Sequence, residues 1–270
     1  MSEPGRLTVG ELFVKTAHRE PMHPARELQL SRFSGILGSA MKISHGPRHV
    51  CLASTETLAH CGVSAAEARV NMTLRTASPE DLASGNLLVI GEAAVRIAFL
   101  CEVCSHGARL AAAPMRRFRK LRRMIGVVVR DGTVRCDTPV QVVRSAFEPV
   151  PETFAERCTW SVARIPRGHA VDAGELLVAV GAGPSYHRVL PRWLKSAGAQ
   201  GAPIHRVLST ALQAPSWAPD ALNLLEAEGA RSPGGGIQRY PLIDALWFDE
   251  QLLWHGEASP ALDAVAVRGA

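Results

Sequence analysis

Several features of membrane-embedded and secreted proteins are missing from this sequence of 270 residues. No apolar run reaches the ~18 uncharged residues that a membrane-spanning helix needs, so we expect no membrane partner. The opening MSEPGRLTVGELFVK lacks the basic start and apolar core of a secretory signal peptide. The six cysteines lie at irregular spacings, which favours reduced thiols over a disulfide framework. We therefore expect a cytoplasmic protein.

Internal repeats are also absent, and the clearest break in the pattern is the proline-containing stretch SAFEPVPETF at 145–154. Before it, runs of branched residues predict β-strands at 48–54, 86–91, 94–100, 125–136 and 140–147. The sequence RDGT at 130–133 is typical of a β-hairpin turn. STETLAHCGV at 54–63 predicts a short helix capped by Ser54. The first half is thus predicted to be mostly β, as a barrel-like or strongly bent sheet.

The second half has helical patterns instead. One helix face of PETFAERCTWSVARI (151–165) collects the apolar residues Phe154, Cys158, Val162 and Ile165. Two more short helices are predicted at 174–185 and 186–198, with Ser185 as cap of the second. This pattern is typical of a helix-turn-helix, and equally of a generic helical hairpin. One face of the last helix would present three cations to phosphates: Arg188, Arg192 and Lys195.

Nearly the whole net charge of +5 comes from RRFRKLRR at 116–123, which holds six basic residues in eight. Such a run indicates either a solvated helix face or connector, or a strip that contacts phosphates.

Cys101 and Cys104 form a C-x-x-C pair at the end of a predicted strand. A structural zinc site commonly uses two such pairs, and no second pair occurs in the sequence. A thioredoxin-like motif opens a helix in a βαβ unit, which this half does not resemble. Structural thiols, a thiolate ligand for a soft metal and a sulfur-carrying nucleophile all remain open.

Segments of the first half also resemble a known family. They are GELFVKTAHREPM, SGILGSAMK, RHVCLASTETLAHCGV, ARVNMTL, LVIGEAAVRIAFLCEVC and GVVVRDGTVRCDTPV. Their order is similar to that of a MOSC domain, the molybdenum-cofactor sulfurase C-terminal family. The resemblance spans residues 7–148 and implies a β-rich, barrel-like domain at 1–148.

The same resemblance implies a molybdenum cofactor (molybdopterin) and the reduction of N-hydroxylated substrates. It matches Cys104 to the metal-binding cysteine, and Arg69 and Asn71 to an Arg-x-Asn pair near the cofactor. Thiolate sulfur suits molybdenum, and arginine and amide donors suit a pterin phosphate. The sequence departs from the family after Gly38, where Ser39 and Ala40 replace an acidic-basic pair.

The second half resembles DNA alkylguanine alkyltransferases and the alkyltransferase-like proteins over residues 152–230. The resemblance rests on ERCTWSVARIPRGHAVDAGELLVAVGAGPSYHRVLPRWLK, PIHRVLST and LLEAEG. In true transferases a reactive cysteine stands between a proline and a His-Arg pair, and a histidine bonded to a glutamate activates it. Here Ile204 takes the place of the cysteine, while His205 and Glu228 match the activating pair. Without a thiol, this position cannot accept an alkyl group.

Other residues of this half match groups that recognise DNA in the family. Arg188 matches the residue inserted into the duplex, and Ser216 and Trp217 fall in the loop of the lesion pocket. Ala173 replaces the tyrosine that helps to turn the nucleotide out. The resemblance implies a domain at 149–232, followed by a tail at 233–270 that packs on the domains.

In fold class we thus predict a two-domain α/β protein: a β-rich, barrel-like MOSC domain, then a mainly α domain with a winged-helix-like helix-turn-helix. The favoured function is molybdenum-pterin-dependent reduction or sulfur transfer at Cys104, served by an electron-transfer partner. The second domain would select DNA or a modified nucleobase. The alternatives are a non-catalytic sensor of DNA lesions and a biosynthetic enzyme with both sites remodelled for a small molecule.

Overall fold

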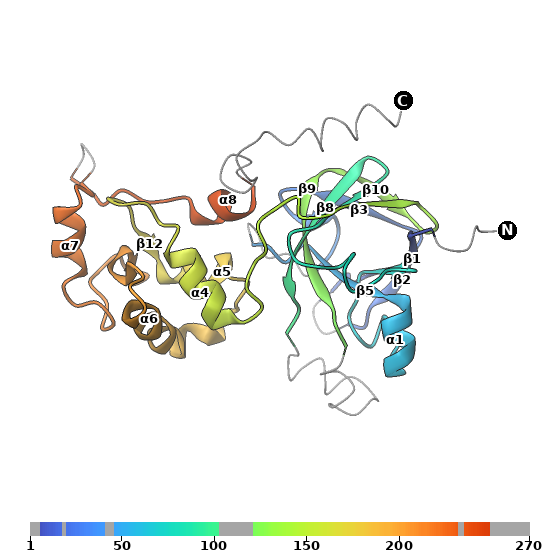
Figure 1. Ribbon diagram of the computed structural model, residues 1–270, viewed down its shortest axis with the longest axis horizontal. Coiled ribbons are helices and arrows are strands. Elements are labelled where there is room, and N and C mark those ends of the chain that lie inside the picture. Colours follow the sequence, from blue (N-terminus) through green and yellow to red (C-terminus); the bar gives the residue numbers. More distant parts are fainter. Residues whose placement is uncertain (1–5, 18–19, 41–45, 103–120, 232–234, 249–270) are drawn as a thin grey trace. The chain divides into compact units, whose positions relative to one another are not determined.

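The computed structural model describes residues 6–17, 20–40, 46–102, 121–231 and 235–248 (Figure 1). These residues form two compact units. Unit 1 comprises the described residues up to 149 except 46–47, and unit 2 comprises 46–47 and 150–248. Within this part of the chain, no helix is long and apolar enough to cross a membrane.

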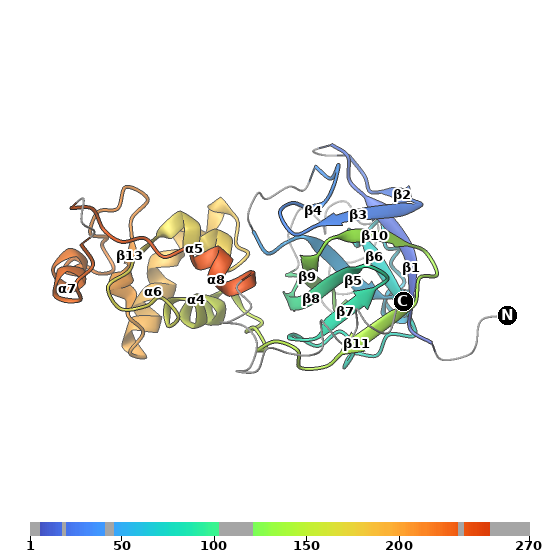
Figure 2. The ribbon, with the colours of Figure 1, turned by 90° about the horizontal axis from the view of Figure 1, so that it is seen from above.

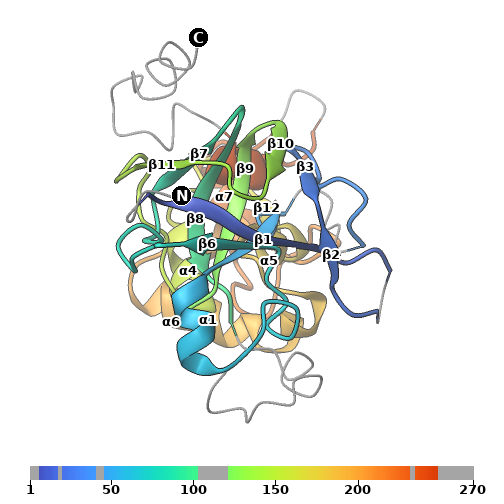
Figure 3. The same ribbon diagram turned by 90° about the vertical axis from the view of Figure 1, so that its right-hand side faces the viewer.

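Unit 1 is built around a curled sheet of eight strands in the order β11-β7-β8-β9-β5-β6-β1-β2 (Figures 2 and 3). Their bounds are β1 (Thr8–Val14), β2 (His23–Ala25), β5 (Val50–Ser54), β6 (Met72–Arg75), β7 (Leu87–Ile90), β8 (Ala93–Leu100), β9 (Met124–Arg130) and β11 (Val140–Val143). A second sheet has the order β10-β3-β4, formed by β10 (Gly132–Arg135), β3 (Glu27–Ser31) and β4 (Gly35–Ile36). The predicted β-rich, strongly bent first half is confirmed.

One helix, α1 (Thr55–Cys61), connects the parallel pair β5 and β6. Its predicted cap is confirmed, because the Ser54 hydroxyl accepts a hydrogen bond from the Thr57 amide at 3.3 Å. Gly62 ends the helix in the left-handed conformation (φ 61°), which glycine adopts without steric cost.

The predicted hairpin at RDGT is wrong. β9 pairs with β5 and β8, whereas β10 pairs with β3, so the two strands that flank Asp131 lie in different sheets. The Asp131 carboxylate accepts a hydrogen bond from the Arg32 amide at 2.7 Å and fixes this crossing. Gly132 is required here, because a Cβ on it would lie 2.6 Å from the backbone nitrogen of Ala93. The backbone thus turns a corner between two sheets.

The main core of unit 1 fills the inside of the curled sheet. It gathers apolar side chains from both sheets, among them Val9, Leu28, Leu52, Leu74, Val95 and Val128. Because successive side chains of a strand point to opposite faces, Cys51 faces away from this core and Leu52 faces into it.

Unit 2 is mainly helical. Its helices are α4 (Phe154–Val162), α5 (Ala173–Ala179), α6 (Leu190–Ala199), α7 (Ala221–Ala227) and α8 (Leu242–Trp247), with the 3-10 turns η1 (Pro184–Arg188) and η2 (Ile204–Arg206). A short parallel pair joins β12 (Val171–Asp172) to β13 (Val207–Leu208). The predicted apolar face is largely confirmed: Cys158, Val162 and Ile165 are buried and Phe154 is half-buried, although α4 ends at Val162.

The two helices after α4 differ from their predicted bounds. α5 ends at Ala179, and α6 starts at Leu190, because Pro184 begins the separate 3-10 turn η1. Ser185 therefore lies inside η1 and does not cap α6. The winged-helix-like helix-turn-helix stays a prediction.

Part of the predicted tail belongs to unit 2. The Trp247 indole N–H donates to the carbonyl of Ala179 at 3.0 Å, which fixes α8 on the end of α5 (Figure 2). Gln238 and Tyr240 exchange backbone hydrogen bonds with Ala170. Residues 249–270 of the tail lie outside the described residues.

Candidate functional site

The first candidate site surrounds Cys101, the residue directly after β8. Its Sγ lies 3.9 Å from Nη1 of Arg48, and Arg48 also forms an ion pair with Glu102 at 2.7 Å. Arg123, which is 4 % exposed, donates to the carbonyl of Glu102 at 3.3 Å. Two guanidinium groups are thus held close to one thiol.

The Cys101 thiol is acidified by these neighbours. A hydrogen bond from the Cys51 thiol is the largest cause; burial opposes it, and the charges of Arg123 and Arg48 add to it, so the pKa of Cys101 falls to about 6. The pKa of Cys51 rises well above its usual value, first because of that hydrogen bond and then because of burial. The surroundings therefore favour the thiolate at Cys101 and the thiol at Cys51.

Asn71, matched by the resemblance to a cofactor-binding residue, joins strands in this structure. Its side-chain oxygen accepts from the Cys51 amide at 3.0 Å, and its side-chain nitrogen donates to the carbonyl of Phe13 at 3.2 Å. The residue is 5 % exposed. Asn71 thus connects β1 to β5 beside the cysteine pair.

Arg69 and Lys15 form a second group of cations in unit 1. Arg69 has a left-handed backbone (φ 55°), and its Nη2 is buried with no hydrogen-bond partner among the described residues. Lys15 is only 6 % exposed, and its pKa is lowered by burial and by the charge of Arg69, with Glu20 acting in the opposite direction. The Ala40 amide donates to the carbonyl of Lys15 at 2.7 Å, so the Gly38–Ala40 loop contacts this group.

Only some of the other residues predicted for unit 1 lie within the described part of the chain. Cys104 lies outside the described residues, as do residues 116–120 of the basic segment. Arg123 of the same segment is buried, which differs from a solvated face because its guanidinium bonds the carbonyls of Ala68 and Glu102. The described residues contain no group of three or more His, Cys, Asp or Glu that could hold a metal.

The sequence reasoning missed Arg48, Arg123 and Cys51 as site residues. Cys101 belonged to the C-x-x-C pair, and within the described part of the chain Cys51 on β5 acts on its pKa. That interaction depends on the tertiary fold, which a single sequence does not supply.

The second candidate site is centred on Glu228 in unit 2. Its carboxylate accepts from His205 Nε2 at 2.9 Å, from Arg206 Nη2 at 2.8 Å and from the Gly168 amide at 3.0 Å. Burial raises the pKa of Glu228, but hydrogen bonds from Arg206, Gly168 and His205 outweigh it and lower the pKa to about 2. His205 and Glu228 are therefore hydrogen-bonded as the sequence predicts, and Arg206 is a further partner of the same carboxylate.

Ile204 lies against helix α6. A Cβ built on Gly198 would stand 2.7 Å from Cδ1 of Ile204, so the glycine leaves a notch that the isoleucine occupies. Ile204 also packs against the small core formed by Ala170, Leu208, Ala218, Ala221, Leu225 and Ala230. Ile204 thus has a packing role between α6 and this core.

The predicted recognition residues lie at different depths. Arg188 and Ser216 are exposed. Trp217 is half-buried on the same small core, and its indole N–H donates to the carbonyl of Val207 at 3.1 Å. Ala173, where the tyrosine would stand, is buried at the start of α5.

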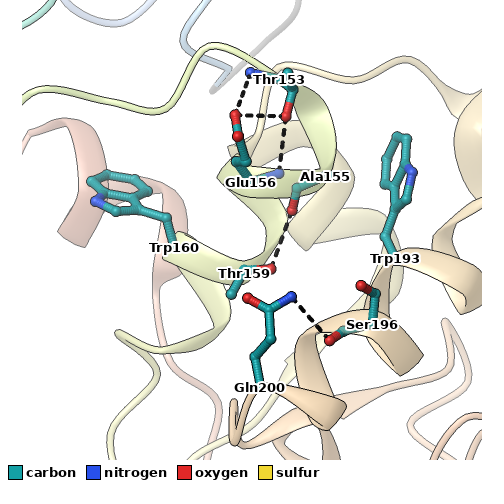
Figure 4. A pocket seen from close by; sticks show the side chains of 8 residues that line it. All are labelled: Thr153, Ala155, Glu156, Thr159, Trp160, Trp193, Ser196 and Gln200. Carbon is teal, nitrogen blue, oxygen red and sulfur yellow. Dashed lines mark hydrogen bonds between the residues drawn. The ribbon is translucent and has the colours of Figure 1, made fainter.

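Unit 2 also contains a pocket of about 510 Å³ between α4 and α6 (Figure 4). Thr159 and Gln200 face one another across it, and Trp160 and Trp193 stand at its two sides. Trp193 stacks on Phe154 with ring centroids 6.0 Å apart, and Arg164 lies 4.1 Å over the Trp160 ring. Both indoles are thus engaged by neighbouring side chains of the protein.

No family model and no curated protein matches this chain. Among solved structures, YuaD from Bacillus subtilis aligns with a TM-score of 0.43 at 16% identity, over 50% of this chain and 95% of that chain. YiiM from Geobacillus stearothermophilus aligns with a TM-score of 0.44 at 14% identity, over 69% and 98%. YiiM from Escherichia coli gives 0.40 at 18% identity, over 68% and 91%. Similarity at this level assigns neither family nor activity, so the function has to be argued from the sites.

Proposed function

We propose that unit 1 is a MOSC-type domain that binds an anionic cofactor and reduces an N-hydroxylated substrate or transfers sulfur. Molybdopterin is the cofactor that the sequence resemblance implies. The observation that carries the proposal is that two cations, the buried Lys15 and the partly buried Arg69, lie close together in unit 1. Neither forms an ion pair with a carboxylate among the described residues, and the charge of Arg69 contributes to lowering the pKa of Lys15.

The donor set fits an anion such as the phosphate of a pterin cofactor. A buried guanidinium nitrogen without an acceptor costs free energy, about 1–3 kcal/mol, which an anionic oxygen next to Arg69 Nη2 would recover. The left-handed backbone of Arg69 supports the same interpretation, since strained residues cluster where ligands are held. Lys15 would add a second charge to the same ligand.

Three groups of the chain would then divide the work. Lys15 and Arg69 would hold the anionic end of the cofactor, and Cys104 would bind the metal, as the resemblance implies. When bound, the cofactor supplies a redox centre. Asn71 would support the site indirectly, because its side chain connects β1 to β5 through two hydrogen bonds to backbone groups.

The test is metal and pterin analysis of the full chain, made in a host that synthesises molybdopterin. We expect molybdenum near one equivalent, lost in C104S and reduced at least fivefold in R69M and K15M. The matched control is R26M, which removes an exposed arginine of the same unit. Wild-type protein free of both metal and pterin would overturn the proposal.

We further propose that unit 2 recognises DNA or a modified base without accepting an alkyl group. The favouring observation is a row of exposed cations on η1 and α6: Arg188, Arg192 and Lys195. Among the described residues none of the three is in an ion pair, so their charges are available for phosphates. Ile204 excludes alkyl transfer because it offers no nucleophile.

Binding to duplexes with and without an alkylated guanine, at two salt concentrations, tests this second function. We expect tighter binding to the duplex with the alkylated guanine. Each of R188A, R192A and K195A should reduce the slope of log binding constant against log salt concentration by about the value of one phosphate contact. R167A, at an exposed arginine elsewhere in unit 2, is the control. Equal affinity for both duplexes would eliminate the lesion-sensor alternative. Absence of binding would leave the small-molecule enzyme.

A further inference from the structure

The pocket between α4 and α6 has two aromatic sides that the protein holds in place (Figure 4). Trp193 stacks on Phe154, and the Tyr186 ring lies against the same indole with centroids 5.6 Å apart. On the other side, the guanidinium carbon of Arg164 lies 4.1 Å from the centroid of the Trp160 ring. Because both indoles are already held, a flat ligand can bind beside them at little cost in side-chain entropy.

Three oxygen atoms of this pocket are able to accept hydrogen bonds from a ligand. The Thr153 amide and hydroxyl both donate to Oε2 of Glu156, and within the described part of the chain no group donates to Oε1. Thr159 Oγ1 donates its hydrogen to a carbonyl one turn earlier, at 3.3 Å, and keeps its lone pairs. The Gln200 amide nitrogen donates to the carbonyl of Ser196 at 3.2 Å, which leaves Gln200 Oε1 as an acceptor.

The charge of the lining disfavours an anionic ligand. None of the 8 residues that line the pocket, all of them described, is a cation, and Glu156 carries their one formal charge. The volume of about 510 Å³ lies within the ~300–1,000 Å³ that is typical of small-ligand sites. The pocket therefore fits a flat, uncharged group that donates hydrogen bonds, and a nucleobase with an exocyclic amino group is such a group.

Helix α6 connects this pocket to the row of exposed cations. Arg192 and Ser196 are four residues apart on α6, so their side chains are neighbours on the helix surface. Ser196 lines the pocket, whereas Arg192 is exposed and forms no ion pair with any described residue. Two indoles and a carboxylate would also suit an organic cation, but the neighbouring positive charges favour a nucleic acid, whose phosphates they attract.

We propose that the pocket between α4 and α6 binds an unpaired, amino-bearing base of a nucleic-acid strand whose phosphate contacts Arg192. The inference rests on the nucleic-acid binding proposed for unit 2. It assigns the base to a different site from the one that the sequence resemblance implies, since neither Ile204 nor His205 lines this pocket. The amino group of the base donates to Glu156 Oε1 and Gln200 Oε1. The base is unpaired, because a base stacked inside a duplex cannot enter a pocket between two helices.

The experiment measures binding of the full chain to labelled decamers of deoxycytidine and deoxyuridine, at pH 8 and at two salt concentrations. The two bases have nearly the same size, but only cytosine carries an amino group. We expect the cytosine strand to bind about tenfold more tightly. T159V and Q200A should reduce that preference to about twofold or less and leave the binding of the uracil strand unchanged. R192A should weaken both strands equally and reduce the salt slope by about one phosphate contact.

A second readout uses a nucleoside without phosphate and so does not depend on the cations. Deoxycytidine should quench the tryptophan fluorescence of the wild type, and the quenching should be at least about twofold weaker in W193F. Quenching by tetramethylammonium in place of deoxycytidine would identify a pocket for organic cations and overturn the inference.

The matched control for Q200A is N223A, which removes an exposed amide side chain on α7 and should bind both strands as the wild type does. Equal affinity of the wild type for the two strands would overturn the pocket assignment and leave the phosphate contacts of the cation row intact. Absence of binding to either strand would instead overturn the nucleic-acid function of unit 2, and this inference with it.

Discussion

At the scale of single residues, the structure gives Glu228 more hydrogen-bond partners than the sequence resemblance implied. In an activating pair, Glu228 would bind only His205 and orient it towards a nucleophile. In the structure, His205, Arg206 and Gly168 all donate to its carboxylate, and Arg206 also binds the carbonyl of Ile165 at 2.7 Å. The carboxylate therefore joins three separate segments of unit 2.

We predict that this carboxylate makes the stability of unit 2 depend on acidity. Its pKa is about 2 in the folded chain and about 4.3 when unfolded, so its stabilisation is complete above about pH 4.5 and is lost as the pH falls towards 2. E228Q should unfold more easily by about 2 kcal/mol at pH 7. Urea unfolding from pH 2 to 7 measures both effects; parallel curves for wild type and E228Q would contradict the prediction.

Gly198 and Ile204 should show a strong energetic coupling. G198A improves helix propensity by about 0.5–1 kcal/mol, but its methyl group would meet Cδ1 of Ile204. We expect no gain or a loss in the wild-type background, and a net gain when combined with I204V, which lacks that atom. A double-mutant cycle by denaturant unfolding should give at least about 1 kcal/mol of coupling, and additive effects would disprove the contact.

Single residues could be predicted from the sequence where their interactions join residues close together in the chain. Ser54 as a helix cap could be predicted because its bond spans only three residues. The effect of Cys51 on the pKa of Cys101 could not be predicted, since fifty residues separate the two along the chain.

At the scale of elements, β9 and β10 illustrate the limit of turn signals. Asp-Gly favours a tight reversal, but the alternative of crossing to another sheet uses the same two residues. Asp131 bonds Arg32, and Gly132 passes the backbone of Ala93. The pairing of β10 with the distant strand β3 decides between the two, and the Asp-Gly sequence does not indicate that pairing.

We predict that G132A destabilises unit 1 by about 1–3 kcal/mol. The added Cβ would meet the backbone nitrogen and Cα of Ala93, which cannot rotate away as a side chain would. Thermal or urea unfolding measures the loss. G183A is the control, since nothing lies within 4 Å of the added Cβ and its φ is −84°; a comparable loss in both variants would show that the contact is not the cause.

At the scale of the whole molecule, the chain has two compact units with separate apolar cores. The change from strand to helix patterns in the sequence already indicated two kinds of fold. The cofactor site could be predicted from sequence only in part: the resemblance pointed to Arg69, but the approach of Lys15 to Arg69 arises from the fold.

We expect the two cores to respond independently to mutation. The tryptophans of the described residues all lie in unit 2: Trp160, Trp193, Trp217 and Trp247. E228Q should therefore shift the unfolding transition that tryptophan fluorescence reports, and no other. G132A should leave that transition in place and shift the far-UV signal of the β-rich unit. Hydrogen exchange with peptide resolution checks the assignment, and equal shifts of both units by either variant would mean that they unfold together.

The notch at Gly198 finally bears on the history that this half of the chain can have. If the segment descends from a protein with a cysteine before His205, replacement by isoleucine placed a larger side chain against a helix that has no side chain to give way. A single reversion would empty that notch and return a thiol to a carboxylate already bound by Arg206. A cysteine at position 204 would therefore lower the stability of unit 2, because its smaller side chain leaves part of that notch unfilled.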